Sequence, residues 1–391
     1  LKSSPLKQLK SGAFRAKERV VLNIINYFEE PYFEFNESTF WKKNSYILFV
    51  FYLFVEELTE IDRQIKLVDY WKFPEEDLLI IKHDWNTIVR KIKEGKAHEI
   101  SEGDTFYLGA CTKGSTTVKS LRKQPFSSTL AKQRAYSLKQ GYVNHIIAKI
   151  SHDKVETYGK IVKRPDILSS TTLEELVVSK FEEHYGKSPK ELVKTFNISL
   201  NAQAKNYIAS LTKAILGIEL NKRIEEFEKA DIIVKSIRLD KRDIPAQNLS
   251  FPAFKYEEII QQEWEDSDLF NMLSKKFFFV FYQHEEDALV LRKVKFWNMP
   301  MKDIEDVKIV WDKTIDVINK GNIVKEVTNN KRYTYFPNLS ENRICHVRPH
   351  ANATSDTYPL PVKDIYTGAT EYSKHCFWLN KGYIKASIFE E

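Results

Sequence analysis

Apolar residues gather in short runs separated by charged segments. The run YILFVFYLFV, residues 46–55, is aromatic and uninterrupted. A helix needs about 20 apolar residues to cross a bilayer, so this shorter run predicts a buried central strand instead. The letters FVFY occur inside it at residues 49–52 and again at residues 279–282, each time flanked by charge. Two such strands in one chain indicate a repeated unit.

A helix with the same pattern follows each strand. Trp85 and Gly95 enclose NTIVRKIKE, and Trp311 and Gly321 enclose DKTIDVINK. The apolar residues recur at helical spacing, and glycine commonly ends a helix. Further along, SLKQGYV at residues 137–143 matches WLNKGYI at residues 378–384. Chance similarity between two aromatic strands is the alternative, but matched blocks in the same order favour duplication.

The predicted fold is therefore α/β with a mixed sheet in each of two tandem domains. A chain of 391 residues also exceeds the usual size of one hydrophobic core. We expect a first domain over residues 1–160, a polar linker over 161–172 and a second domain over 173–391. The second begins with helices, since Ser188, Pro189 and Glu191 form a capping box. Because no such helices precede residue 1, we expect the first domain to lack its N-terminal part.

Positive charge is concentrated in the first domain. The net charge is only +6, yet residues 105–152 contain no Asp or Glu. A segment this basic favours a polyanion such as DNA or RNA, although a solvated basic face is the common alternative. Glycine and small polar residues within it would let the backbone approach phosphates, which favours nucleic acid. The basic residues are Lys113, Lys119, Arg122, Lys123, Lys132, Arg134, Lys139 and Lys149.

The cysteines indicate no structural chemistry. Three cysteines without CxxC spacing predict neither a disulfide framework nor a zinc site, which fits a reducing cytoplasm. We expect folded-in thiols and DNA-facing imidazoles where cysteine and histidine are clustered. The aromatic pair Phe377 and Trp378 could stack on bases but is more typical of a core. The clustered residues are Cys345, His346, His350, His375 and Cys376.

The start of the chain matches a segment beyond its midpoint. LKSSPL opens the chain and VKSIRL starts at Val234, so that Lys2 aligns with Lys235. A lysine at the start of a strand is usually a surface cation. Many metal-dependent DNA nucleases, however, use Asp followed by Glu-x-Lys, in which two carboxylates hold Mg²⁺. If Lys2 is that lysine, the Glu precedes Leu1.

The chain resembles the MutH family of GATC-directed endonucleases, and in particular the Sau-type type II restriction enzymes with two MutH-like domains. The resemblance rests on ordered motifs in both halves. They include LKSSPLKQLKSGAFRAKERVVLNIINY, GKAHEISEGDTFYLGACTKG and AKQRAYSLKQGYV in the first half, and GKSPKELVKTFNI, EEFEKADIIVKSI, FFFVFY, ICHVRPHANA and CFWLNKGYI in the second.

The resemblance implies roles for residues of the first domain. Lys2 would be the catalytic lysine, with the acidic metal ligands upstream of Leu1 and none in this chain. Lys113, followed by Gly114, falls on the lysine of the family's Arg-Pro-Lys recognition loop, although CTKG here lacks the Arg and Pro. Residues 105–152 would line the DNA cleft, with phosphate contacts from Lys119, Arg122 and Lys123.

In the second domain the same loop reads Arg348, Pro349 and His350. Arginine is the commonest specific reader of guanine, so Arg348 is the candidate base contact, with His350 beside it. Ile233 stands where the Glu of Glu-x-Lys would be, and the family's Asp falls on Glu226. Because isoleucine cannot ligate Mg²⁺, this domain is expected to bind DNA without cutting it.

These observations predict a Mg²⁺-dependent restriction endonuclease that hydrolyses double-stranded DNA at GATC. Its second domain is expected to be an allosteric DNA-binding effector, and the enzyme a cytoplasmic homodimer on DNA with no membrane association. Residues 1–391 alone are expected to cleave poorly or not at all. The alternatives are a non-catalytic DNA-binding protein with two dead modules and a mismatch-repair nicking enzyme.

Overall fold

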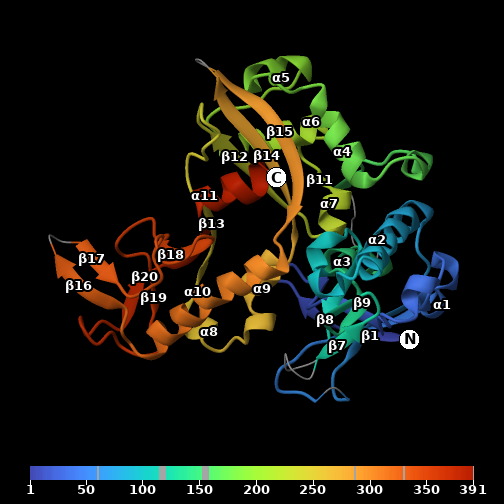
Figure 1. Ribbon diagram of the computed structural model, residues 1–391, viewed down its shortest axis with the longest axis horizontal. Helices are drawn as coiled ribbons and strands as arrows, with labels where there is room; N and C mark the ends of the chain where they lie inside the picture. The colour runs from blue at the N-terminus through green and yellow to red at the C-terminus, as the bar shows by residue number, and fades with distance from the viewer. Residues whose placement is uncertain (60, 114–119, 152–157, 286–287, 329–330, 391) are drawn as a thin grey trace. The chain divides into compact units, whose positions relative to one another are not determined.

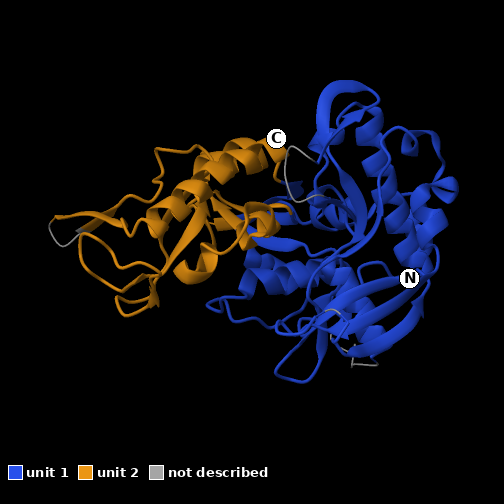
Figure 2. Cartoon of the chain, turned by 90° about the horizontal axis from the view of Figure 1, so that it is seen from below, with its two compact units in different colours: residues 1–236, 275–280, 290–298 blue, residues 237–274, 281–289, 299–391 orange. Residues whose placement is uncertain are grey.

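The computed structural model describes residues 1–391 except 60, 114–119, 152–157, 286–287, 329–330 and 391. Strands and helices are mixed along the whole chain (Figure 1). Two compact units are distinguished in Figure 2. The first comprises residues 1–236, 275–280 and 290–298, and the second comprises residues 237–274, 281–289 and 299–391. Within the described part of the chain, no helix combines the length and the apolar character needed to cross a membrane.

Two sheets and two helices make up the first copy of the repeat. One sheet has the order β2-β1-β4-β5, in which β1 is parallel to β4, and the other has the order β3-β9-β6. The elements are β1 (Lys2–Gln8), β2 (Phe14–Ala16), β3 (Val20–Ile24), β4 (Ile47–Leu53), β5 (Ile65–Trp71), α2 (Glu75–Lys93), β6 (Leu108–Thr112), β9 (Arg134–Leu138) and α3 (Gln140–Ile150).

The second copy repeats this order. Its sheets are β12-β14-β15 and β13-β21-β18, which match β1-β4-β5 and β3-β9-β6 strand for strand. The predicted duplication is thereby confirmed at the level of topology. The elements are β12 (Ile233–Leu239), β13 (Leu249–Phe254), β14 (Lys276–Glu285), β15 (Ala288–Asn298), α10 (Met301–Asn319), β18 (Cys345–Pro349), β21 (His375–Leu379) and α11 (Lys381–Tyr383).

Shorter elements connect and extend these sheets. The short helices are η1 (Glu30–Tyr32), η2 (Phe35–Glu37), α1 (Thr39–Asn44), η3 (Ala97–Glu99), η4 (Glu102–Asp104), η5 (Pro165–Ser169), α4 (Leu173–Glu182), α5 (Pro189–Thr195), α6 (Tyr207–Ile215), α7 (Glu225–Lys229), α8 (Tyr256–Ile259), η6 (Trp264–Asp266), α9 (Asp268–Leu273) and the π-helix η7 (Ile384–Phe389). The short strands are β7 (Leu121–Gln124), β8 (Ser127–Lys132), β10 (Tyr158–Gly159), β11 (Arg223–Ile224), β16 (Val324–Thr328), β17 (Lys331–Thr334), β19 (Thr357–Pro359) and β20 (Glu371–Ser373).

The apolar runs form the cores, as the sequence predicts. In β4, Ile47, Phe49 and Phe51 are buried while the alternate residues are half-buried. Strand β14 is buried on both faces from Lys276 to Gln283, which explains its continuous aromatic run. The predicted capping box is also present, since Ser188 and Glu191 exchange hydrogen bonds at the start of α5.

The two long helices end in the same way. Gly95 and Gly321 follow α2 and α10 with φ of 70° and 61°, the left-handed conformation that glycine adopts most readily. A backbone carbonyl packs against each glycine, and a Cβ would lie 2.5 Å from the oxygen of Phe126 or 2.7 Å from that of Lys363. Both positions therefore require glycine for conformation and for space.

The repeated Gly-Tyr pair, called the GY motif here, lies at residues 141–142 and 382–383. In each copy its tyrosine forms a hydrogen bond to the long helix. The Tyr142 hydroxyl donates to Asp77 of α2 at 2.9 Å. The Tyr383 hydroxyl donates to Asp303 of α10 at 2.7 Å. The repeated motif thus has a structural function, which is to fix the helix after the second sheet against the long helix.

The compact units divide the chain differently from the repeat. The first unit contains the whole first copy together with helices α4 to α7 and parts of β12, β14 and β15. Residues 161–172, the predicted linker, also lie within it. The domain boundaries that the repeat indicates therefore remain a prediction about which segments of the chain are homologous.

Candidate nucleic-acid interface and active-site lysine

The two recognition loops lie at equivalent positions of equivalent sheets. Cys111 of β6 pairs with Ala135 of β9, and Arg348 of β18 pairs with Cys376 of β21. One step beyond each strand, the Lys113 amide donates to the Gln133 carbonyl and the His350 amide donates to the Lys374 carbonyl, both at 2.8 Å. The backbone register therefore places CTK of the first copy on RPH of the second, as the sequence alignment predicts.

Buried carboxylates hold the segment that leads into β6. Asp84 of α2 is fully enclosed and accepts hydrogen bonds from the amides of Phe106, Tyr107 and Leu108 at 2.7 to 2.9 Å. Burial raises the pKa of Asp84, and the three amides oppose that rise. These bonds fix the residues that lead into β6 and its first residue, and thus the direction of the strand that Lys113 follows.

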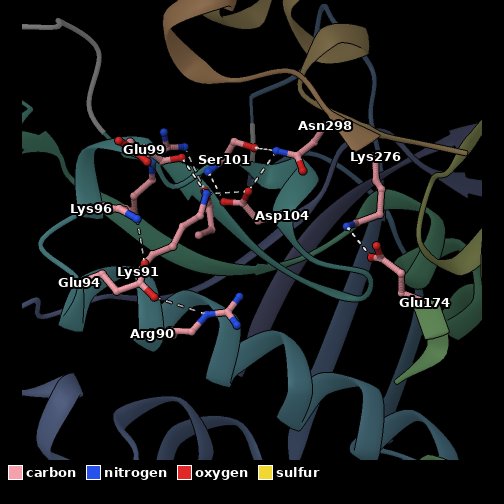
Figure 3. Close-up of polar contacts among 12 residues, drawn as sticks. Arg90, Lys91, Glu94, Lys96, Glu99, Ser101, Asp104, Glu174, Lys276 and Asn298 are labelled. Atoms are coloured by element: carbon pink, nitrogen blue, oxygen red, sulfur yellow. Dashed lines mark hydrogen bonds and ion pairs between the residues drawn. The ribbon is translucent and has the colours of Figure 1, made fainter. Parts of the chain in front are cut away.

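A second carboxylate, that of Asp104, braces the turn before β6. Lys91 and Asn298 point toward it in Figure 3, with nitrogen to oxygen distances of 2.8 and 3.1 Å. Its other oxygen accepts the amide of Ser101 at 2.8 Å. Asn298 belongs to β15 of the second copy, so a residue of the second copy supports the loop of the first within one compact unit.

Lys2 lies at the start of β1, beside β4, in the register Lys2 to Phe49. Its ammonium donates to the carbonyl of Leu22 in β3. Burial lowers the pKa of Lys2, and the nearby ammonium groups of Lys43 and Lys113 lower it further. The structure thus brings the predicted active-site lysine within electrostatic reach of the predicted recognition loop.

The equivalent site of the second copy is not built for a metal ion. Lys235 on β12 has its pKa lowered by burial. Glu226, which aligns with the family's Asp, is 4% exposed and accepts the amides of Ile161 and Val162 at 3.0 and 2.8 Å. Both oxygens of its carboxylate therefore accept hydrogen bonds from backbone amides. Across the described residues of both copies, no cluster of three or more His, Cys, Asp or Glu side chains could hold a metal.

The residues present therefore do not make up the Mg²⁺ site that the resemblance implies. The charged groups that act on Lys2 are lysines, which repel a cation. The acidic ligands that the resemblance implies upstream of Leu1 remain a prediction.

Only part of the basic stretch presents its charge to solvent. Lys113, Arg122 and Lys123 are exposed, the latter two on the β7–β8 hairpin. Arg134 and Lys139, in contrast, are buried and donate to the carbonyls of Ala110 and Thr105. The expectation that the whole stretch faces DNA was thus wrong for these two residues, which satisfy buried backbone groups. Gly114 and Lys119 lie outside the described residues.

In the second copy, Arg348 and His350 are both exposed and both contact Trp378. The guanidinium carbon of Arg348 lies 4.1 Å from the ring centroid, and the His350 ring centroid lies 5.5 Å away. Trp378 and Phe377 are buried, which confirms that they are core residues. This loop therefore exposes an arginine and a histidine, and the indole of Trp378 contacts both.

The prediction of DNA-facing imidazoles was wrong for two histidines. His346 is 3% exposed and its Nδ1 lies 2.6 Å from Asn380. His375 is 1% exposed and contacts Tyr256. Burial lowers the pKa of both imidazoles, so they are neutral members of the core. The cysteines are buried free thiols, as expected.

The sequence did not predict a buried ionic network in the first compact unit. Lys229 of α7 lies 2.8 Å from Asp77 of α2 and 2.8 Å from Glu225, with almost no exposure of the lysine or Asp77. The Glu225–Lys229 spacing could have indicated a local pair, but no local pattern predicts a partner 152 residues away.

Comparisons with known proteins place the chain among DNA-processing enzymes. The family model "DNA mismatch repair enzyme MutH" matches residues 1–84. The chain is 35% identical over 426 aligned positions to the type II restriction enzyme Sau3AI of Staphylococcus aureus, an alignment that covers 99% of this chain and 86% of that protein.

Proposed function

Because this chain belongs to the MutH-like, Sau-type family of type II restriction endonucleases, we propose that its first copy cleaves double-stranded DNA at GATC and that its second copy binds GATC as an effector. The family itself supports nuclease activity and DNA as the partner. The observation that carries the finer proposal is the matched register of the two loops, with Lys2 near the first of them.

In the first copy, we assign the role of catalytic residue to Lys2. A half-buried ammonium whose pKa is lowered is suited to position an attacking water. Its acidic partners, and with them Mg²⁺ dependence, are proposed from the resemblance. The chemistry that Mg²⁺ would supply is stabilisation of charge on the scissile phosphate.

The test of catalysis compares two lysines of one strand. In a chain extended at its N-terminus by the acidic residues that the resemblance implies, Lys2→Ala should abolish cleavage of GATC plasmid. Lys7→Ala, at an exposed residue of β1, should retain it. Residues 1–391 alone should not cleave. Full activity of the Lys2→Ala variant would show that Lys2 is not catalytic.

DNA phosphate contacts are assigned to Lys119, Arg122 and Lys123, and a base-edge contact to Lys113. Removal of each cation from a phosphate should reduce the slope of log affinity against log salt by about 0.9 and weaken binding to all duplexes alike. Binding titrations of the Lys119/Arg122/Lys123 triple alanine variant at several salt concentrations test this assignment. An unchanged slope and affinity would refute it.

In the second copy, we assign guanine recognition to Arg348, with His350 beside it. Arg348→Ala should reduce the preference for GATC over a scrambled duplex by about 1–3 kcal/mol for each base that the arginine recognises. It should also abolish the activation of cleavage by an added GATC duplex, a coupling expected at about 1–3 kcal/mol. Arg242→Ala, an arginine whose side chain is 82% exposed, is the matched control. Unchanged preference in Arg348→Ala would leave the second copy a structural domain.

The remaining features of the proposal concern assembly and location. A homodimer on DNA would give a two-fold symmetric cut of the palindromic GATC site. Its test is the mass of the complex with a GATC duplex. A cytoplasmic location is proposed as well, and fractionation of cells tests it.

A further inference from the structure

The recognition strand of the second copy rests on an aromatic residue at a defined place in its sheet. In the antiparallel pair β18–β21, His346 lies opposite Trp378 and Arg348 lies opposite Cys376. Arg348 and Trp378 are therefore diagonal neighbours on the same face, close enough for long side chains to touch. The guanidinium carbon lies over the ring, 4.1 Å from its centroid, which is a cation–π contact.

Arg348 and Trp378 differ in their exposure to solvent. Trp378 is only 9% exposed, whereas Arg348 is exposed. Within the described residues, the indole N–H of Trp378 is buried without a hydrogen-bond partner, so the ring acts on Arg348 through its face. Because a cation–π contact uses the charge of the guanidinium and not its N–H groups, those groups stay available to form hydrogen bonds. The edge that would form a bidentate contact with a base thus remains available.

The stack is absent from the first copy. There the residues equivalent to Arg348 and Trp378 are Cys111 and Ser137, as the registers of the two strand pairs show. Neither can stack on an aromatic ring or hold a guanidinium. The aromatic support therefore occurs together with the arginine, in the copy whose metal position is occupied by Ile233.

We propose that Trp378 is a positioning residue that holds Arg348 in the orientation for base recognition and thereby sets the sequence preference of the second copy. This inference rests on the proposed role of Arg348. Its physical basis is preorganisation, because an exposed arginine otherwise loses rotamer freedom when it binds. The stack removes part of that cost before DNA arrives. His350 contacts the same ring.

The experiment uses the full chain in a Lys113→Ala background, so that the first recognition loop adds no preference of its own. Binding of a GATC duplex and of a scrambled duplex is measured for Trp378→Leu and Trp378→Phe. Loss of the stack in Trp378→Leu should weaken GATC binding about 3- to 10-fold, with scrambled binding and the salt dependence unchanged. Trp378→Phe should retain most of the preference, since it keeps an aromatic face.

A double-mutant cycle separates positioning from general support of the fold. Once Arg348 is alanine, Trp378→Leu should cause no further loss of GATC preference. An equal loss on both duplexes, or the same loss with and without Arg348, would overturn the inference. The unfolding midpoint of each variant is measured first, and binding is compared well below it. If Trp378→Leu fails to fold, the comparison of Trp378→Phe with the parent decides, and a Phe variant that has lost all preference would overturn the inference.

The outcomes also distinguish this inference from the proposal on which it rests. If Arg348→Ala abolishes GATC preference and Trp378→Leu leaves it intact, only the role of Trp378 fails. If Arg348→Ala leaves the preference intact, the role of Arg348 in recognition fails, and that of Trp378 fails with it.

Discussion

The equivalent glycines of the two GY motifs provide a matched test of the packing. Gly141 is the second residue of α3 and Gly382 is the second residue of α11. A Cβ on Gly141 would lie 1.9 Å from the carbonyl oxygen of Glu228, whereas a Cβ on Gly382 would meet nothing within 4 Å. The same substitution to alanine should therefore destabilise the fold at Gly141 but not at Gly382.

The magnitude follows from the surroundings of Gly141. Real Cβ atoms essentially never come closer than 3.0 Å, so the 1.9 Å approach requires the backbone to separate by more than 1 Å. Overpacking of this kind costs about 1–3 kcal/mol. The same movement stretches the 2.8 Å hydrogen bond from the Gly141 amide to Asp231, and such a bond to a charged group contributes about 1.5–3 kcal/mol.

Alanine favours a helix over glycine by about 1 kcal/mol, which offsets part of that cost. We therefore expect Gly141→Ala to lower the free energy of unfolding by about 2–5 kcal/mol. Gly382→Ala should leave it unchanged or raise it by up to about 1 kcal/mol.

Urea unfolding of both variants and the parent measures these differences, and amide exchange in α3 locates the loss. If Gly141→Ala were as stable as the parent, within about 0.5 kcal/mol, the packing of α3 against residues 228–231 would be refuted.

Two further predictions concern buried charge. Lys229→Met leaves Asp77 buried without its cation and should destabilise the fold by about 3–5 kcal/mol. Lys320→Met, which breaks an exposed pair at the C-terminal end of α10, should cost about 0.5 kcal/mol or less. Burial already raises the pKa of Asp77, and loss of Lys229 should raise it further, so the deficit measured by urea unfolding should shrink as the pH is lowered and the carboxyl protonates; a deficit that grows in acid would contradict this. Lys43→Gln removes a repelling charge and should raise the pKa of Lys2, which NMR titration of the lysine side-chain carbons measures; an unchanged pKa would show that the two ammonium groups do not interact.

The sequence by itself determined what depends on local periodicity and on comparison of the chain with itself. The aromatic run predicted β4, the Trp to Gly segments predicted α2 and α10, and the capping box predicted the start of α5. These features follow from the alternation of side chains along a strand and from hydrogen bonds between neighbouring residues. The order of the matched blocks predicted the duplicated topology, since homologous segments fold alike.

The tertiary structure alone decided which polar residues are buried and what they contact. His346 and Lys139 are residue types that are common on DNA-binding surfaces. Both are buried, however, because the surrounding strands and helices cover them. The partner of Lys229 is in α2, and the ring under Arg348 is on β21, which residues 350–374 separate from β18 along the chain. Contacts of this kind depend on how distant elements pack, and no local pattern of residues specifies them.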